Sequence, residues 1–227
     1  VGDIWYVLGS DDILRFTYDG TSYFWLDING PITTSSIGTS SGSAKAWVNY
    51  NGNAAGAIFQ TDTNISSTTG SLWIGYSGGL IYVSKHGAGQ GTQLTYSWSP
   101  SAERWYHIAV SRNSGTLRLF VDGALANTVS DSTSYVQGGI AIGVITTPTY
   151  MTGYISNLRF IKGTGLYTSA FTPSTTPLTA VANTLLLTCQ SNRFVDNSNN
   201  AYSITVNGDT SIKPFSPFAP TSDYAAN

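Results

Sequence analysis

Short runs of apolar and β-branched residues recur along the chain, with turn-forming residues between them. Several runs alternate with a period of two. In 116–121, for example, Leu117, Leu119 and Val121 point to one side of an extended strand. No stretch of ten or more residues shows a helical period, and we expect at most a short helical turn at 165–169. The pattern therefore predicts an all-β chain.

The candidate strands of the central part of the chain follow one another at intervals of about 8–12 residues, which is the spacing of a β-sandwich or barrel. They are 44–50, 57–61, 71–76, 80–85, 93–98, 105–111, 116–121, 139–144, 153–160, 183–188 and 202–206. Turn residues separate them throughout. We therefore expect one large antiparallel domain in this region.

The two ends of the chain differ from this central part. Three short β-prone runs near the N-terminus, separated by Gly- and Asp-containing turns, predict a small meander, and a Ser-, Thr- and Gly-rich linker follows. Near the C-terminus three prolines punctuate Phe215 and Phe218, and proline prevents continued sheet pairing. The predicted division is a β-module with linker at 1–40, a sandwich at 41–213 and an extended Pro-rich tail at 214–227.

Two points in this division remain open. The run 16–23 is either part of the separate N-terminal module, which we prefer, or the first strand of the sandwich itself. The tail is expected to pack Phe215 and Phe218 on a neighbour or on its own domain.

Charged residues make up only 10% of the chain and the formal net charge is -2. An ordinary soluble protein has about 25% charged residues. Because no cluster of Lys and Arg is present, nothing is suited to neutralise a row of phosphates or to lie on an acidic membrane surface. No apolar stretch is long enough to cross a bilayer. We therefore expect no nucleic-acid binding and no membrane insertion.

A pair of segments carries a family likeness. Trp105-Tyr-His-Ile-Ala-Val-Ser-Arg112, followed by a strand that ends in Val121-Asp-Gly123, resembles the signature of laminin G-like domains. The later run 153–160 and the turn 196–200 fit the same family. The resemblance covers about 45–210. It implies an antiparallel jelly-roll β-sandwich of the concanavalin A and laminin G kind.

Two further segments narrow the resemblance. The run 162–173, with Leu185-Leu-Leu-Thr-Cys-Gln190, is similar to the version of this domain in tail and fibre proteins of bacterial viruses, and 2–27 looks like a short module between fibre domains. This likeness implies a location on the virion surface, or extracellular. It also implies partnership with virion proteins and with copies of the chain itself, for example in a trimer.

Concanavalin-like sandwiches also include glycoside hydrolases, which need two carboxyl groups flanking the scissile bond. Glu103 is the only glutamate, and no strand carries a closely spaced pair of aspartates. The two histidines are widely spaced, and His107, within the family signature, is expected to be structural. We therefore expect no enzyme activity and no catalytic residues.

Laminin G-like domains often hold calcium at the sandwich rim through Asp and Asn oxygens, so the resemblance makes Asp196, Asn197 and Asn199 a possible calcium site. The alternative, which we favour because one acidic group binds the ion poorly, is that Asp196 organises a turn. No cofactor is therefore assigned, although calcium remains possible.

Sugar binding depends on aromatic rings that cover the apolar face of a pyranose, with amides and hydroxyls beside them. The candidates are Trp73, Tyr76, Tyr82, Trp98, Tyr150 and Tyr154. The favoured function is therefore a non-catalytic virion adhesion protein that binds cell-surface glycans through many weak contacts. The alternatives are a purely structural virion or filament building block without a ligand, and a secreted lectin-like binding domain.

Overall fold

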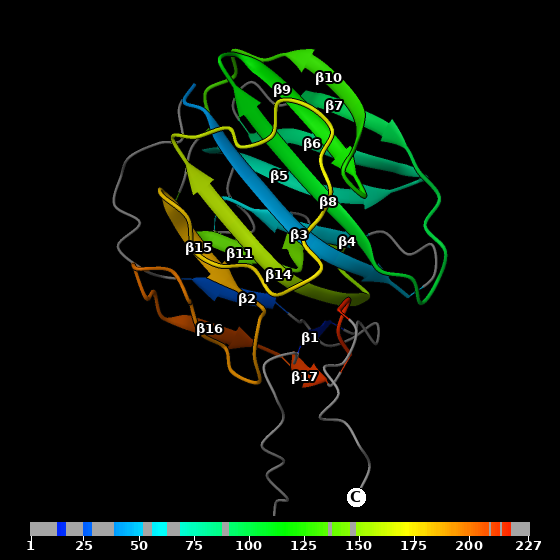
Figure 1. Cartoon of the computed structure of the whole chain (residues 1–227), viewed down its shortest axis with the longest axis vertical. Coiled ribbons are helices and arrows are strands. Elements are labelled where there is room, and N and C mark those ends of the chain that lie inside the picture. The colour runs from blue at the N-terminus through cyan, green and yellow to red at the C-terminus, as the bar shows by residue number, and fades with distance from the viewer. Residues whose placement is uncertain are drawn as a thin grey trace, which may run out of the picture.

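The computed structural model describes residues 13–16, 25–28, 39–51, 56–62, 69–87, 91–135, 138–145, 149–208, 210–213 and 215–218. Every regular element in these ranges is a β-strand, and the strands form two large antiparallel sheets that pack as a sandwich (Figure 1). The expected all-β jelly-roll class is confirmed.

The first sheet, sheet A, has eight strands. Seven of them lie in the order β10 (Ala124–Ser130), β9 (Thr116–Val121), β8 (Tyr106–Asn113), β3 (Gly42–Tyr50), β14 (Gly153–Lys162), β1 (Ile13–Phe16) and β17 (Ser211–Lys213). The eighth, β15 (Thr184–Thr188), pairs with the second half of β14, beyond the stretch of β14 that pairs with β1. β3 therefore lies in the middle of the sheet, between β8 and β14.

The second sheet, sheet B, has seven strands. Their order is β16 (Ile204–Asn207), β2 (Trp25–Ile28), β11 (Ile140–Ile142), β4 (Gly56–Gln60), β5 (Thr69–Ser77), β6 (Leu80–Gly87) and β7 (Gly91–Ser97). A separate two-stranded ribbon joins β12 (Val144–Ile145) to β13 (Thr149–Tyr150).

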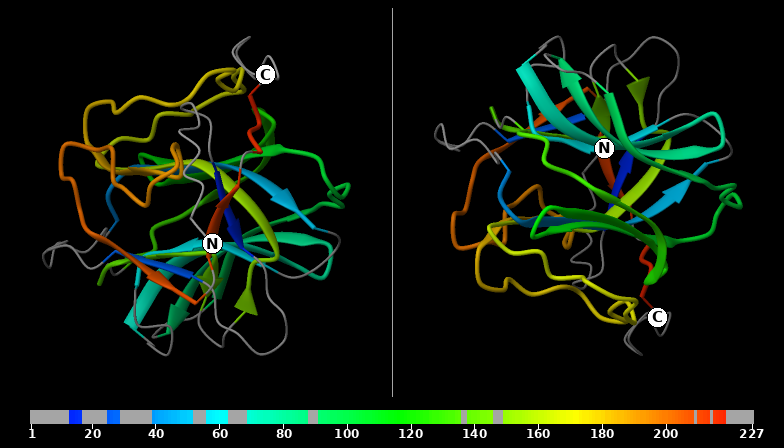
Figure 2. Two further views of the ribbon diagram at one scale, coloured as in Figure 1. Left: turned by 90° about the horizontal axis from the view of Figure 1, so that it is seen from below. Right: turned by 90° about the horizontal axis from the view of Figure 1, so that it is seen from above.

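The hydrophobic core lies between the two sheets, which Figure 2 shows as stacked layers. Alternation along the strands places every second residue in this core. In β3, Ala46 and Val48 are buried there, and Val48 pairs across the sheet with the fully buried Ile155 of β14. Burial of each such side chain contributes on the order of 1.5–3 kcal/mol.

The other face of sheet A is covered as well, and this decides where a binding site can form. Residues 163–182, here called the covering segment, run outside the sheet across β3 and β8 (the yellow segment in Figure 1). Tyr167 donates its backbone N–H to the Ser111 hydroxyl, and Phe171 donates its own to the Gly123 carbonyl. As a result Lys45, on the outer face of β3, is only 8% exposed.

Gly123 holds the covering segment close to the sheet. It follows Asp122 in the expected Val-Asp-Gly turn, and both residues have positive φ, 50° at Asp122 and 80° at Gly123. A Cβ at Gly123 would overlap the Phe171 carbonyl oxygen. The turn and the approach of the covering segment therefore both require glycine at this position.

Three details differ from the sequence-based expectations. β1 and β2 belong to different sheets and pair with sandwich strands, so these two strands are not neighbours in a meander. Of the run 16–23, whose place in the module or in the sandwich the sequence leaves open, only Phe16 is described, so that choice and the boundaries at residues 40 and 213 stay predictions. The first of the three N-terminal runs, at 3–7, lies outside the described residues. Residues 165–169 form a bend rather than a helical turn, because their backbone amides bond to sheet A instead. β10 was not expected, because its sequence, ALANTVS, lacks a clear apolar face and its side chains are mostly exposed at the sheet edge.

Candidate functional site

An aromatic cleft lies on the outer face of sheet A, where β3 ends and β8 begins. Asn49 of β3 pairs across the sheet with Tyr154 of β14, and Trp47 pairs with His107 of β8 on the opposite side. Trp105 immediately precedes β8, and its ring centre lies 6.2 Å from that of Tyr154. Three adjacent strands thus bring aromatic and amide groups together at one end of the sheet.

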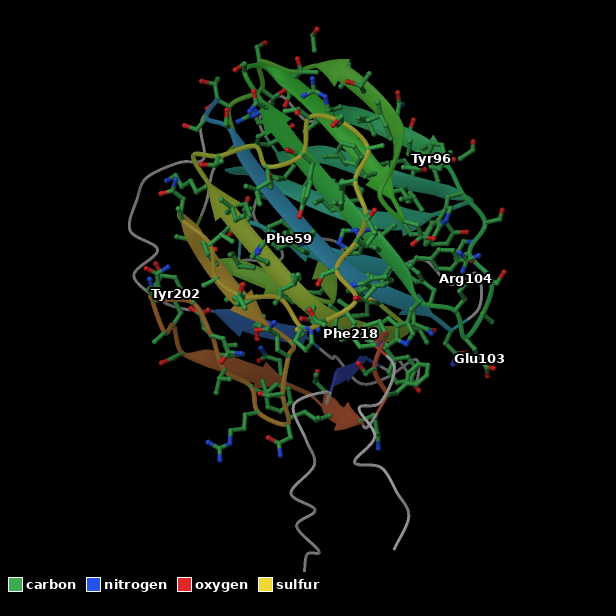
Figure 3. The ribbon with its side chains drawn as sticks, in the orientation of Figure 1. Phe59, Tyr96, Glu103, Arg104, Tyr202 and Phe218 are labelled. Carbon is green, nitrogen blue, oxygen red and sulfur yellow. The ribbon has the colours of Figure 1, made fainter. Side chains whose placement is uncertain are left out.

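The start of the C-terminal tail packs into this cleft. The ring centre of Phe215 lies 5.3 Å from that of Trp105 and 4.9 Å from that of Tyr154, and Phe218 contacts Trp47 at 6.1 Å. Figure 3 shows Phe218 at this end of the molecule, toward the loop that carries Glu103 and Arg104. Residues 215–218, the described part of the tail, therefore pack on their own domain, which was one of the two expected outcomes.

Two hollows adjoin the tail. The smaller, about 390 Å³, is lined by Asn49, Asn51, Glu103, Tyr154 and Phe215. The larger, about 540 Å³, lies between the tail and the covering segment, and both volumes fall in the range of small-ligand sites. Its lining residues include the indoles of Trp47 and Trp105 and the side chains of Thr172, Ser174, Thr175 and Phe218.

Polar atoms without partners lie in and beneath the cleft. Asn49 is 1% exposed, and neither its amide nitrogen nor its amide oxygen has a hydrogen-bond partner in the described part of the chain. The indole nitrogens of Trp47 and Trp105 are also buried and unpartnered there. A buried polar group left unsatisfied costs about 1–3 kcal/mol, so the cleft is better suited to a hydrogen-bonding ligand than to its present surroundings.

The charges around the cleft are few and mostly exposed. Arg104 and Asp122 form an ion pair of 3.1 Å at the larger hollow, with side-chain exposures of 62% and 37%. Such an exposed pair contributes little to stability. Glu103 stands exposed at the smaller hollow. Each hollow is thus lined by one carboxylate, and a hydrolytic pair does not line either of them within the described residues.

A buried cationic layer lies deeper, under the covering segment. Burial, followed by the charge of Arg159, lowers the pKa of Lys45 to about 7. Burial, followed by the charges of Lys45 and Arg159, lowers the pKa of His107 to about 3. His107 is neutral and packed between Trp47 and Phe171, and its ring nitrogens have no partner among the described residues. Its burial agrees with the structural role expected for His107, although no hydrogen bond within the described residues holds its side chain. Neither Lys45 nor Arg159 lines either of the two hollows.

The residues that the sequence suggested for sugar binding are scattered. Tyr76 is 3% exposed and packs in the core with Tyr50 and the half-buried Trp98. Tyr150, which belongs to β13, is 5% exposed and packs with Ala141 and Val144. For Tyr76 and Tyr150 the structure corrects the expectation, because a buried ring cannot stack on a surface ligand.

Only Tyr154 of the six reaches the cleft. Trp73 and Tyr82 stack on each other at 6.0 Å on the outer face of sheet B, half-buried and away from the other candidates. Sequence reasoning missed Trp47, Asn49 and Trp105, because their strand positions predicted packing and the tail that meets them is distant in the chain. The feature of the sequence that could have pointed to the cleft was Asn49, because it places an amide within a β-strand.

The possible calcium ligands form a closed turn. One oxygen of the Asp196 carboxylate accepts the backbone N–H groups of Leu187 and Ser198, at 3.0 and 2.8 Å. The other accepts the Ser198 hydroxyl and the Tyr202 N–H, at 2.8 and 3.0 Å. Asp196 is 8% exposed. Four donors already use its lone pairs, so this donor set does not fit a calcium ion, and Asp196 organises the turn.

Two features are absent from the described residues. No group of three or more His, Cys, Asp or Glu side chains is placed to hold a metal ion. Among the same residues, no helix has the length and apolar character needed to cross a membrane.

Comparison with solved structures shows the fold. The chain resembles a putative carbohydrate-binding protein from Bacteroides ovatus, with a TM-score of 0.61, 17% identity, and coverage of 93% of this chain and 62% of that one. It also resembles a heptameric SAP-like pentraxin from Limulus polyphemus, with a TM-score of 0.54, 14% identity, and coverage of 88% and 95%. The receptor-binding domain of botulinum neurotoxin D matches with a TM-score of 0.51, 16% identity, and coverage of 74% and 44%.

No curated protein matches the sequence. The model of one family, described as the concanavalin A-like lectin/glucanases superfamily (Laminin_G_3), matches residues 14–164, more than half of the chain and including β2 and most of β1. This match and the jelly-roll sandwich agree with the resemblance seen in the sequence. The chain therefore belongs to the concanavalin A-like lectin/glucanases superfamily.

Proposed function

We propose that this chain is a non-catalytic carbohydrate-binding protein and that the aromatic cleft beside Trp105 holds the sugar. The observation that carries the proposal is Asn49, which lines the 390 Å³ hollow together with Tyr154 and whose buried amide has no hydrogen-bond partner among the described residues. A pyranose presents an apolar C–H face and a rim of hydroxyls. Tyr154 and Trp105 supply the ring surfaces, and the Asn49 amide supplies one donor and one acceptor.

The absence of catalysis in this proposal follows from the carboxylates. Hydrolysis of a glycosidic bond needs two carboxyl groups about 5–9.5 Å apart on either side of the bond. Asp122 is committed to Arg104 and to the backbone N–H of His107. Glu103 therefore has no second acid opposite it in the smaller hollow, within the described residues. Binding without bond cleavage is the function that this arrangement supports.

The biological setting is also a proposal. The segments 162–173 and 185–190 are similar to virion tail and fibre proteins. We therefore place the chain on a virion surface or another extracellular surface, as a homo-oligomer such as a trimer that docks on other virion proteins. Many weak copies acting together would then hold a host-cell glycan firmly.

The test is a glycan array probed with the assembled chain and with an Asn49→Leu variant, which keeps the size of the side chain but removes its amide. We expect the unmodified chain to bind a subset of glycans and the variant to lose at least about tenfold in affinity, as for a site whose ligand loses its hydrogen-bond partner. A matched control is Asn192→Leu, which makes the same change at an exposed amide outside both hollows and should leave binding unchanged. A flat response from the assembled chain would reject sugar binding and favour the building-block alternative.

A further inference from the structure

The two hollows share one floor. Trp105 lines the larger hollow, and its ring also meets Tyr154, which lines the smaller one. Trp47 and Asn49 are two positions apart on the same face of β3 and belong to different hollows. Such residues lie about 6–7 Å apart along a strand, roughly the length of one sugar unit. Residues 215–218 lie across this floor.

The tail contacts the floor through apolar rings, although the floor also carries polar groups. Phe215 and Phe218 touch the floor through ring contacts with Trp105, Tyr154 and Trp47. The hydrogen bonds of the described tail stay within residues 213–218. The indole nitrogens of Trp47 and Trp105, whose rings the two phenylalanines contact, are buried without a hydrogen-bond partner among the described residues, and Phe215 is still 36% exposed. A group with both an apolar face and hydroxyl acceptors would fit this floor better.

We infer that the two hollows are the ends of one glycan-binding groove, and that a glycan of two or more sugar units displaces residues 215–218 to fill it. This inference rests on the proposed function. One unit enters the Asn49 end, and the next lies over Trp105 toward Trp47, in the place that Phe215 and Phe218 occupy. The indole N–H groups then donate to the hydroxyls of the glycan.

The charges select the class of glycan. Among the described residues that line the smaller hollow, Glu103 carries the only charge, and at the larger one Arg104 is neutralised by Asp122. A carboxylate on a sugar would meet Glu103 without a compensating cation among the described lining residues. The groove therefore fits neutral glycans and disfavours acidic ones.

The tail lowers the apparent affinity for long glycans. When a binding-competent state is only partly populated, the observed affinity falls by that fraction. Weakening the ring contacts of the tail raises the open fraction, so binding of long glycans improves. A single sugar unit that fits beside the docked tail gains little.

The experiment uses the full chain and neutral gluco-, manno- and galacto-oligosaccharides of one to four units, followed by calorimetry. We expect affinity to rise from one unit to two, and Phe215→Ala with Phe218→Ala to raise the affinity for two or more units by at least about fivefold. One-unit binding should not improve in the same way, because a single unit at the Asn49 end needs no displacement of the tail and Phe215 itself lines that hollow. Leu125→Ala, which shortens an apolar side chain on β10 that is 45% exposed, is the control and should change neither.

Phe215→Ala alone is a second variant, because Phe215 is partly exposed and its loss disturbs the fold least. It should shift the long glycans in the same direction. Unchanged or weaker binding of the long glycans in both tail variants overturns the inference while leaving the proposed function intact. If no variant binds any of these sugars, nor any glycan on the array, both fail.

Discussion

Asn49 and Tyr154 are direct cross-strand partners in sheet A, yet the Asn49 amide, 1% exposed, makes no hydrogen bond within the described residues. A sheet interior normally satisfies such a group. Asn49 lines a hollow together with the aromatic residue Tyr154, and an amide beside a ring is the combination that a sugar uses. Asn49 is thus a residue whose place in the fold is better explained by binding than by packing.

The first prediction separates stability from binding at this residue. Replacing an unsatisfied polar group by an apolar one of similar shape is neutral or stabilising. Asn49→Leu should therefore unfold with a free energy equal to that of the unmodified chain or about 1 kcal/mol higher, while glycan binding falls. Denaturant unfolding at equilibrium measures the first quantity. A loss of more than about 1 kcal/mol would show that Asn49 is a packing residue.

The second prediction concerns pH and Lys45. The pKa of Lys45 is 10.5 in its ordinary state and about 7 in the fold. Between these values the unfolded chain binds one more proton than the folded chain, so this residue makes stability rise as pH rises and fall as pH falls toward 7. From pH 7 to 8.5 the expected gain is about 1–2 kcal/mol.

Lys45→Met is the comparison for this prediction, because it keeps the apolar stem of the side chain and removes the ammonium group. The dependence of the unfolding free energy on pH between 7 and 8.5 should be flatter in this variant. Parallel curves for the two chains would mean that Lys45 titrates in the fold as it does in water.

The third prediction concerns the buried ion pair of Arg112 and Asp131, whose side chains are 5% and 1% exposed. Asp131 also accepts the Tyr135 hydroxyl at 3.1 Å. Asp131→Ala leaves the Arg112 charge buried and should lower the unfolding free energy by about 3–5 kcal/mol. The exposed pair is the control: Arg104→Ala should cost less than about 1 kcal/mol. Similar losses in the two variants would contradict the assigned burial.

The fourth prediction concerns the covering segment. Gly123→Ala meets both a positive φ and the Phe171 carbonyl, so the segment must move and thermal stability should fall by the equivalent of about 2–4 kcal/mol. Gly79 has almost the same φ, 79°, with open space around it. Gly79→Ala should therefore lose only about 1 kcal/mol. Equal losses would mean that the close approach of Phe171 has no energetic consequence.

Elements that depend on residues close together in sequence could be predicted. The alternation of apolar residues predicted β9, and Val121-Asp-Gly123 predicted the turn that follows it. β10 was not predicted, because an exposed edge strand needs no apolar face. The strand at 44–50 was predicted and is part of β3, but both of its faces are largely buried, which alternation alone does not predict. The burial of its outer face depends on residues 163–182, more than a hundred positions later.

The site was less predictable than the fold. Aromatic rings in β-strands serve as core or as platform, and sequence gives no means of separating Tyr76, which is buried, from Tyr154, which lines the cleft. The cleft is formed by residues near positions 49, 105, 154 and 215. Only the pairing of β3 with β8 and β14 brings the first three together. The role of Phe215 depends on where the tail leaves β17, which no local pattern encodes.

The most direct test of the central claim is a solution NMR titration of the full chain with a neutral oligosaccharide that it binds on the array, following the indole N–H signals. We expect the signals of Trp47 and Trp105 to move on saturation, as their unpartnered N–H groups gain acceptors, while that of Trp73 on sheet B stays in place. Movement confined to Trp73, or no movement of the Trp47 and Trp105 signals at saturating sugar, would contradict the assignment of the cleft.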